Sequence, residues 1–369
     1  MNNLIELSQL NDISLNDIEL VSIDNTYVFL KYYNTLKEHK NIIDNYSKEW
    51  DSYKKYMNPY ELIYSPYDRY INTSNYKPIS RSFFKMWEML NKFNLITIED
   101  DIVIANIAEG PGGFIEAIFK YKKQNMNDLY LSNTLYPSNR NIPSWNKFKK
   151  FIQDNNINCI KLLYCDLYNY DKVMEYIINF KNKKATFITA DGGFDYSSDF
   201  NKQEEQSYHI IYSEIAIALA IQEEKGNFVI KIFDTFTLFT LKCIFLLQIF
   251  YSNVYLYKPL TSRVANSEKY VVCKGFKGIN EELLTKILES IKTFPEKNPD
   301  ITSIILSNDF IYEFDSYNKL FVDNQIEFID KTLDIIKNKD NLNFDKIVEE
   351  QIKNAKEWCN TYDFKLFSK

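Results

Sequence analysis

The sequence predicts an α/β protein with a mostly parallel sheet of seven strands, helices on both faces and an antiparallel edge strand. Short apolar runs alternate with helical patterns from residue 101 to residue 276. Runs of this kind, separated by helices, are typical of parallel strands that are buried on both faces. The last two runs are joined by a loop without a helical pattern, so we expect the antiparallel edge strand there.

The strand-like and helical patterns follow one another in a regular order. Strands are expected at 102–107, 129–132, 160–164, 185–189, 228–233, 254–257 and 270–273. Helices are expected between most of them, at 113–122, 144–155, 171–180, 203–224 and 235–251.

Two extensions flank this domain, which we assign to residues 76–278. Residues 1–75 form a polar N-terminal extension with a helical patch at 27–45, and prolines between 58 and 78 indicate an extended connection. An amphipathic helix is expected at 80–93, with Lys85 beside its apolar stripe. Residues 279–369 form a C-terminal helical extension, with helical patterns at 281–293, 325–337 and 344–360.

Charge and composition exclude several functional classes. The chain has 369 residues and a net charge of −6, which argues against broad non-specific nucleic-acid binding but leaves room for a local basic groove. No signal peptide is visible, and the most apolar stretch, 236–251, is too short to span a bilayer, so we expect a soluble protein without membrane contact. Five cysteines without a Cys-x-x-Cys pair predict buried, reduced thiols, and two histidines give no basis for a metal site.

A glycine-rich turn closes the first strand-like run of the domain. Gly110, Pro111, Gly112 and Gly113 connect that run to the next helix. Glycine is needed where the backbone approaches a ligand or takes a positive φ, and ligands bind at the carboxyl ends of parallel strands. A tight crossover without a ligand is the alternative. The spacing differs from Gly-x-Gly-x-x-Gly, so a nicotinamide dinucleotide is not expected.

Four charged residues stand in separate apolar segments of the domain. Asp191, Lys231 and Glu268 lie at the edges of strand-like runs, and Lys85 lies on the helix at 80–93. One such lysine alone is usually surface charge. Two lysines and two carboxylates beside a glycine-rich turn, however, indicate a catalytic cleft for group transfer rather than a binding scaffold.

The Pro-Gly-Gly-Phe sequence that begins at Pro111 resembles the cofactor loop of the FtsJ-like (RrmJ-type) 2′-O-ribose methyltransferases. The resemblance spans about 80–276, and the four charged residues match the family's Lys-Asp-Lys-Glu catalytic tetrad in chain order. Segments 81–85 and 258–276 are most similar to the mRNA cap-1 methyltransferases. The resemblance implies a Rossmann-like methyltransferase fold and S-adenosylmethionine as cofactor. The Asn-, Ile-, Lys- and Tyr-rich composition indicates an AT-rich genome, such as that of a large DNA virus or of an AT-rich protist.

The resemblance also implies contacts to the cofactor. Asp166 would lie near the adenine, with a helix cap or turn as the alternative. Asn133 lies nearest to the position where the family holds the ribose hydroxyls with an acidic residue. The loop departs from the commoner Asp-x-Gly-x-x-Pro-Gly-Gly form at Asn106 and Ala108. The full expected set is Glu109, Gly110, Pro111, Gly112, Gly113, Phe114, Asn133, Asp166 and Asp191.

Roles for the tetrad and for the RNA-contacting residues follow from the same resemblance. Lys231 is expected to contact the 2′-OH, with Asp191 and Glu268 orienting it and Lys85 holding the ribose or its 3′-phosphate. Burial and Lys85 would lower the pKa of Lys231, whereas the two carboxylates would raise it. Substrate contacts are expected at Arg81, Tyr196, Ser197 and Arg263, with a structural salt bridge equally open for Arg263.

These expectations predict an mRNA cap 2′-O-ribose methyltransferase that converts cap-0 to cap-1 at the first transcribed nucleotide. The alternatives are a ribosomal or other RNA 2′-O-methyltransferase and a non-catalytic RNA-binding subunit with the same fold. Capped mRNA is the expected partner, together with other capping or transcription components. The expected location is intracellular: the host cytoplasm or the virion for a viral protein, the nucleus for a cellular one.

Overall fold

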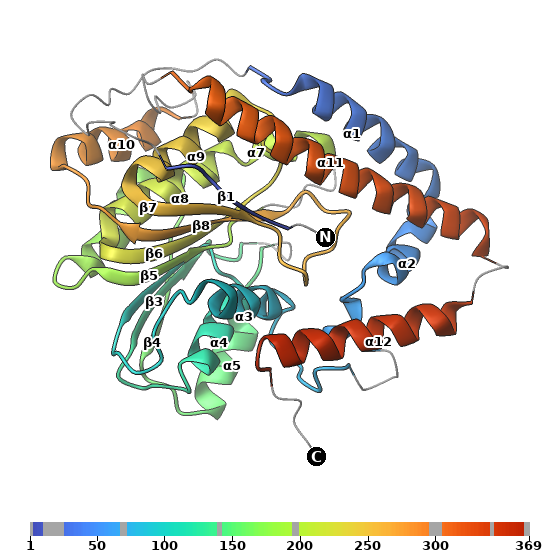
Figure 1. The fold of residues 1–369 in the computed structure, drawn as a ribbon. Coiled ribbons are helices and arrows are strands. Elements are labelled where there is room, and N and C mark those ends of the chain that lie inside the picture. Colours follow the sequence, from blue (N-terminus) through green and yellow to red (C-terminus); the bar gives the residue numbers. More distant parts are fainter. Residues whose placement is uncertain are drawn as a thin grey trace.

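The computed structural model describes residues 3–9, 26–66, 72–138, 142–193, 199–294, 305–339 and 343–364. At its centre lies an eight-stranded sheet in the order β1-β7-β8-β6-β5-β2-β3-β4 (Figure 1). The strands are β1 (Leu4–Glu6), β2 (Val103–Ile107), β3 (Leu129–Thr134), β4 (Ile160–Tyr164), β5 (Ala185–Ala190), β6 (Gln222–Ile232), β7 (Tyr251–Tyr257) and β8 (Lys269–Phe276).

Helices cover both faces of the sheet and extend beyond it. They are α1 (Leu30–Ile43), α2 (Ser47–Met57), α3 (Ser82–Phe93), α4 (Gly113–Tyr121), α5 (Asn146–Asp154), α6 (Tyr170–Ile177), α7 (Gln203–Gln206), α8 (Tyr208–Ile221), α9 (Leu238–Phe250), α10 (Glu281–Thr293), α11 (Asn308–Lys337) and α12 (Phe344–Thr361). Short 3-10 helices are η2 (Asp44–Tyr46), η3 (Glu61–Ile63), η4 (Ile178–Phe180) and η5 (Phe200–Lys202).

The sheet is mostly parallel, as predicted, but it has one strand more than the sequence pattern indicated. Strands β2 to β6 pair in parallel with one another. Strand β8 runs antiparallel and lies inside the sheet, between β6 and β7. The added strand β1 pairs antiparallel with β7 and forms the edge. The antiparallel edge position is therefore occupied by a segment of the N-terminal extension.

Alternation along the strands produces two hydrophobic cores, one on each face of the sheet. In β2, Val103, Ala105 and Ile107 belong to one core, whereas Ile104 belongs to the other. The first core includes buried residues of α6, α8, α9, α10 and α11. The second includes buried residues of α3, α4, α5 and α12. Successive strand residues point to opposite faces, so strands with apolar residues at every position are held between two helical layers.

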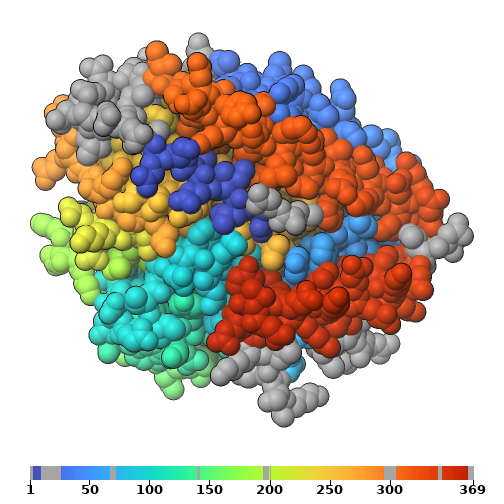
Figure 2. Space-filling view, in the orientation of Figure 1, coloured from blue at the N-terminus to red at the C-terminus, as the bar shows by residue number. Residues whose placement is uncertain are grey.

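The extensions pack against each other and against the sheet domain. Helix α11 contacts α1 and α2, and α12 contacts η3. In Figure 2, α11 (orange) and α12 (red) form much of the visible face, and the β1 segment (dark blue) lies at the surface beside α11. Within the described residues, no helix is long and apolar enough to cross a membrane. The five cysteines are all buried and unpaired.

Candidate active site

The glycine-rich turn after β2 is shaped by close packing. Gly112 has a φ of 113°, and a Cβ there would lie 2.7 Å from the Phe148 ring. A Cβ at Gly110 would lie 2.7 Å from Thr134 Oγ1. The Glu109 carboxylate accepts a hydrogen bond from the Phe114 backbone N at 2.7 Å and so holds the first turn of α4. The three glycines thus leave little side-chain bulk on this turn at the carboxyl end of β2.

The strand register brings the predicted catalytic residues together. Ala190 of β5 pairs with Ile230 of β6, so Asp191 follows directly beside Lys231. Lys231 is in turn the cross-strand partner of Tyr270 in β8. Glu268 precedes Tyr270 by two residues, and residues two apart in an extended segment lie on the same face. Three neighbouring strands therefore deliver their polar groups to one point.

The four charged groups form two ion pairs at that point. Lys231 Nζ lies 3.1 Å from Asp191 Oδ1 and donates to the Asp191 backbone oxygen at 2.9 Å. Lys85, from the first turn of α3, pairs with Glu268. The Tyr270 hydroxyl lies 3.1 Å from Glu268 Oε1 and 3.3 Å from Asp191 Oδ1, so it can donate to either carboxylate and links the two pairs.

The charges within this cluster determine the protonation state of Lys231. Burial lowers the pKa of Lys231, but the Asp191 and Glu268 carboxylates outweigh burial and raise that pKa above its ordinary value. Burial raises the pKa of Glu268, but the Lys85 and Lys231 ammonium groups hold it below its ordinary range. Lys231 is therefore an ammonium group at neutral pH and acts as a hydrogen-bond donor.

Two buried acids lie behind the cluster. Burial and the Asp191 charge raise the pKa of Glu109 well above its ordinary value, and burial raises the pKa of Glu214 to about 8. Glu214 accepts a hydrogen bond from the Gly192 backbone N at 2.9 Å. Burial thus disfavours the charged form of both acids, and Glu214 supports the backbone of the site through its hydrogen bond to Gly192.

A cavity of about 920 Å³ joins the turn to the catalytic cluster. Gly110 lies on its wall, and Asp191, Lys231 and Glu268 form another part of its surface. Asp166 also lines the cavity. This volume is in the range of small-molecule and cofactor sites. The remaining lining residues are Ala108, Thr134, Leu135, Ile142, Pro143, Cys165, Leu167, Tyr168, Gly193, Gln203, Ile210 and Phe233.

The other residues predicted to contact a cofactor support the turn instead of lining the cavity. Asn133 is fully buried, and its side-chain oxygen accepts a hydrogen bond from the Ala108 backbone N at 3.1 Å. The ribose contact expected of Asn133 is therefore not supported, because Thr134 and Leu135 are the residues of that segment on the cavity wall. Glu109, Pro111, Gly112, Gly113 and Phe114 do not line the cavity either.

Two of the residues predicted to contact the substrate lie in described segments. Arg263 forms a two-point salt bridge with the buried Glu61, at 2.7 and 3.0 Å, so the geometry favours the structural alternative for this residue. Arg81 lies just before α3, with its guanidinium 5.9 Å from the Tyr64 ring centre. Tyr196 and Ser197 lie outside the described residues.

Tyr270 and Glu214 were not identified from the sequence. A signal for Tyr270 existed, because an extended segment places residues 268 and 270 on one face. Glu214 carried no such signal, because it stands in the apolar pattern of α8.

Comparison with known sequences identifies the family. A sequence model of the FtsJ-like methyltransferase family matches residues 78–276, more than half of the chain. The chain belongs to the FtsJ-like methyltransferase family. This membership agrees with the parallel sheet, its inserted antiparallel strand and the position of the glycine turn.

Individual relatives in the FtsJ-like family match only part of their own length. Cap-specific mRNA (nucleoside-2′-O-)-methyltransferase 1A of Caenorhabditis briggsae is 26% identical over 275 residues, 65% of this chain and 29% of the relative. Cap-specific mRNA (nucleoside-2′-O-)-methyltransferase 1 of Mus musculus is 32% identical over 194 residues, 49% of this chain and 22% of the relative. Inactive cap-specific mRNA (nucleoside-2′-O-)-methyltransferase 1B of Caenorhabditis briggsae is 25% identical over 274 residues, which cover 65% of this chain and 30% of the relative. The chain thus spans less than a third of each of these relatives.

Membership of the FtsJ-like family implies the use of S-adenosylmethionine, and the cavity fits such a ligand. Gly110 presents bare backbone to the cavity at a place where a Cβ would meet Thr134 and Pro143. Asp166 is exposed and adds a carboxylate to the cavity wall. Leu135, Ile142 and Leu167 add apolar surface against which a flat ring can pack. These residues would hold the cofactor, with the Lys231 cluster beside it.

Proposed function

We propose that this protein is an S-adenosylmethionine-dependent mRNA cap 2′-O-ribose methyltransferase. It transfers a methyl group to the 2′-OH of the first transcribed nucleotide and converts cap-0 to cap-1. The proposal rests on one observation: Lys85, Asp191, Lys231 and Glu268 converge beside the large cavity that begins at the glycine turn. The names of the relatives support the choice of capped mRNA as substrate.

The residues of the cluster suit the alignment of a hydroxyl for attack. S-adenosylmethionine, when bound, supplies a methyl group that its positive sulfonium already activates. The Lys231 ammonium donates to the ribose 2′-oxygen and fixes its position, while Asp191 and the backbone oxygen of residue 191 hold Lys231 in place. Lys85, held by Glu268, lies ready to contact the ribose or its 3′-phosphate.

Loss of the hydroxyl proton follows methyl transfer rather than preceding it. The raised pKa of Lys231 means that its neutral form is scarce at pH 7, so Lys231 is a poor general base in the resting protein. Once the ribose oxygen carries the methyl group, its remaining proton is strongly acidic. A carboxylate such as Asp191 or a water molecule can then accept that proton. Neither the methyl transfer nor this proton loss requires a neutral lysine.

Two other functions fit the same fold. A ribosomal or other RNA 2′-O-methyltransferase would use the same tetrad, and the two extensions distinguish this chain from a bare catalytic domain. A non-catalytic RNA-binding subunit is the second alternative, and one relative carries the word inactive in its name. The complete set of four charged residues, paired within the cluster, favours catalysis over that alternative.

Labelled S-adenosylmethionine and short RNA molecules test the proposal. The protein is incubated with the label and with RNA that carries a cap-0 end, an uncapped triphosphate end or a ribosomal sequence. Nuclease digestion then locates the label. We expect label on the ribose of the first nucleotide of capped RNA and none with Lys231→Ala. Label on ribosomal RNA alone would establish the first alternative, and binding of capped RNA without any transfer by the wild type would establish the second.

A further inference from the structure

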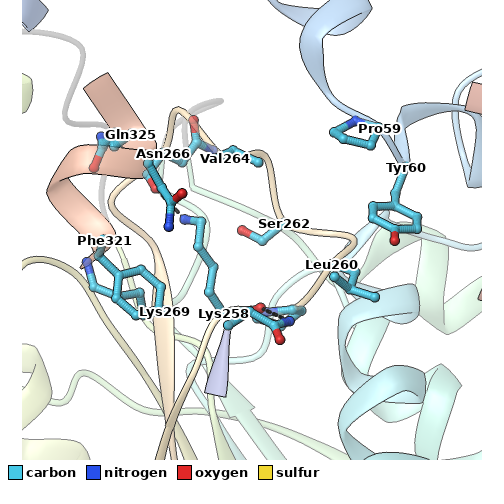
Figure 3. Close-up of a pocket in the computed structure, with 13 residues that line it drawn as sticks. Pro59, Tyr60, Lys258, Leu260, Ser262, Val264, Asn266, Lys269, Phe321 and Gln325 are labelled. Carbon is cyan, nitrogen blue, oxygen red and sulfur yellow. Dashed lines mark hydrogen bonds between the residues drawn. The ribbon is translucent and has the colours of Figure 1, made fainter. Parts of the chain in front are cut away.

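A second, smaller pocket lies beside the catalytic cluster (Figure 3). Its volume is about 170 Å³, and its wall combines apolar side chains such as Leu260, Val264 and Phe321 with polar ones. Figure 3 shows Lys258 and Lys269 between Phe321 on one side and Leu260 and Tyr60 on the other. Ser262 lines the pocket, and its hydroxyl oxygen lies 3.5 Å from Oε1 of Glu268, one of the four catalytic-cluster residues.

Both extensions contribute walls to this pocket. The loop from Lys258 to Lys269 connects β7 to β8 and lies within the segment that matches the family. The remaining lining residues lie outside that segment. They are Asn3, Pro59 and Tyr60 from the N-terminal side and Phe321, Asn324 and Gln325 of α11. The pocket is therefore a property of the complete chain and not of the family domain alone.

Lys258 is the unusual group of this pocket. Its side chain is only 8% exposed, and its Nζ donates to the backbone oxygens of Asn266 and Glu268, the latter at 2.9 Å. Among the described residues, no carboxylate forms an ion pair with it. The two acids whose charges act on Lys258 are already paired, because Asp234 pairs with Lys40 and Lys269, and Glu268 pairs with Lys85. Lys258 thus supplies a positive charge at the pocket without a matching negative charge.

We propose that this pocket is a binding site for a small organic anion, with Lys258 holding its carboxylate or phosphate group. The anion supplies the counter-charge that Lys258 lacks, and its apolar part packs against Leu260, Val264 and Phe321. The volume suits a ligand about the size of a single ring, since a cavity of roughly 150 Å³ accommodates benzene. The side-chain amides of Asn3, Asn266 and Asn324 at the pocket can hydrogen-bond to polar substituents.

A ligand bound in the pocket affects the catalytic cluster through its contact with Lys258. The Lys258 ammonium holds the backbone of Glu268, and the Glu268 side chain holds Lys85. An anion that fixes Lys258 in place fixes the position of Glu268 as well. This regulatory consequence rests on the proposed function, whereas binding of the anion does not.

The affinity should depend on pH. Burial and the neighbouring Lys269 charge lower the pKa of Lys258 to about 7, and Lys85 acts in the same direction, while Glu268 and Asp234 oppose them. An anion would raise this pKa again. Free Lys258 loses its proton as pH rises above about 7, so anion binding weakens from pH 6 to pH 9.

Benzoate and benzamide are the matched probes, because they share size and differ in charge. The full-length protein is titrated with each probe at pH 6.5, and binding is followed by ligand-observed NMR. We expect a millimolar dissociation constant for benzoate and at least tenfold weaker binding of benzamide. Equal binding of the two probes, or binding of neither, would overturn the proposal. None of these outcomes depends on methyl transfer.

Two variants localise the binding. Lys258→Met removes the cation, and we expect benzoate affinity to fall at least tenfold. Asn324→Asp places a carboxylate at the pocket from the half-exposed surface of α11, with little risk to folding, and should weaken benzoate binding by a similar factor. Circular dichroism verifies the fold of each variant. Unchanged benzoate affinity in folded Asn324→Asp protein would refute the location, whatever the fate of Lys258→Met.

Competition distinguishes two sources of the anion. A short RNA is added to the benzoate complex of the wild-type protein. Displacement of benzoate by RNA, and not by an equally charged dextran sulfate, identifies the anion as a phosphate of the RNA strand. Retention of benzoate in the presence of saturating RNA identifies the ligand as a free small molecule.

Discussion

The Arg263–Glu61 salt bridge gives the sharpest test of how the loop after β7 is held. Glu61 is buried in η3, and its carboxylate accepts hydrogen bonds from Arg263 Nε and Nη2. We predict that Arg263→Met lowers the stability of the protein and leaves RNA affinity nearly unchanged. The reason is that the variant leaves a buried carboxylate without its cation.

The magnitude follows from the protonation of Glu61. Burial raises the pKa of Glu61, but Arg263, together with hydrogen bonds from Asn58 and Ser65, outweighs burial, and the net result is a pKa lowered from 4.5 to about 2. That difference corresponds to about 3 kcal/mol in favour of the charged form in the folded state. Arg263 supplies the largest of the effects that lower this pKa, so its loss should cost about 3 kcal/mol, the lower end of the roughly 3–5 kcal/mol typical of broken buried pairs.

Thermal and urea unfolding at pH 7.5 measure this cost, with a double-mutant cycle as control. The double variant Glu61→Gln, Arg263→Met should recover part of the loss, because it removes the uncompensated charge. The lowered folded pKa also predicts a pH dependence: the stability that Glu61 contributes is present above about pH 4.5 and is lost as pH falls through about 2. An unchanged unfolding midpoint together with weaker RNA binding would refute the reasoning and establish a phosphate contact instead.

Three further predictions concern the catalytic site. Lys231→Ala should lower turnover by several orders of magnitude with S-adenosylmethionine affinity nearly unchanged, as measured by calorimetry; equal losses in both would contradict the assigned role. Tyr270→Phe, which removes the hydroxyl between Asp191 and Glu268, should lower turnover about 10- to 100-fold in single-turnover assays with little change in unfolding midpoint, and wild-type turnover would count against that link. Gly110→Ala should weaken S-adenosylmethionine binding at least tenfold, because its Cβ would lie 2.7 Å from Thr134 Oγ1, and unchanged affinity would remove the turn from the cofactor site.

The convergence of the catalytic cluster could be predicted because it depends on local signals. Asp191, Lys231 and Glu268 stand where apolar runs begin or end, and parallel strands collect their carboxyl ends at one edge of a sheet. The glycine turn indicated the same edge. The direction of the pKa of Lys231 could not be predicted, because it depends on distances between residues of different strands. The structure decides it through the Asp191 and Glu268 carboxylates.

Features that depend on contacts between distant parts of the chain could not be predicted from the sequence pattern. Strand β1 has three residues, too few to display alternation, and its partner β7 lies about 250 positions away. Helix α11 was expected only in its second half. Its first half carries buried Phe310, Phe314, Tyr317 and Phe321 at helical spacing, but polar Asp, Asn and Ser residues between them weaken the helical signal. Asn133 lies near the end of the second strand of the domain, where a ribose contact was expected, but its side chain accepts a hydrogen bond from the Ala108 backbone N before the glycine turn.

The pairing of β1 with β7 has a practical consequence for handling the protein. An uncovered strand edge offers a row of free N–H and C=O groups to any other chain with a similar edge. Residues 4–6 occupy that row on β7 along residues 255–257. Deleting the first residues of the chain, or attaching a bulky tag immediately before Leu4, would expose the edge of β7 and favour concentration-dependent aggregation. A tag placed after residue 369 leaves the pairing of β1 with β7 in place.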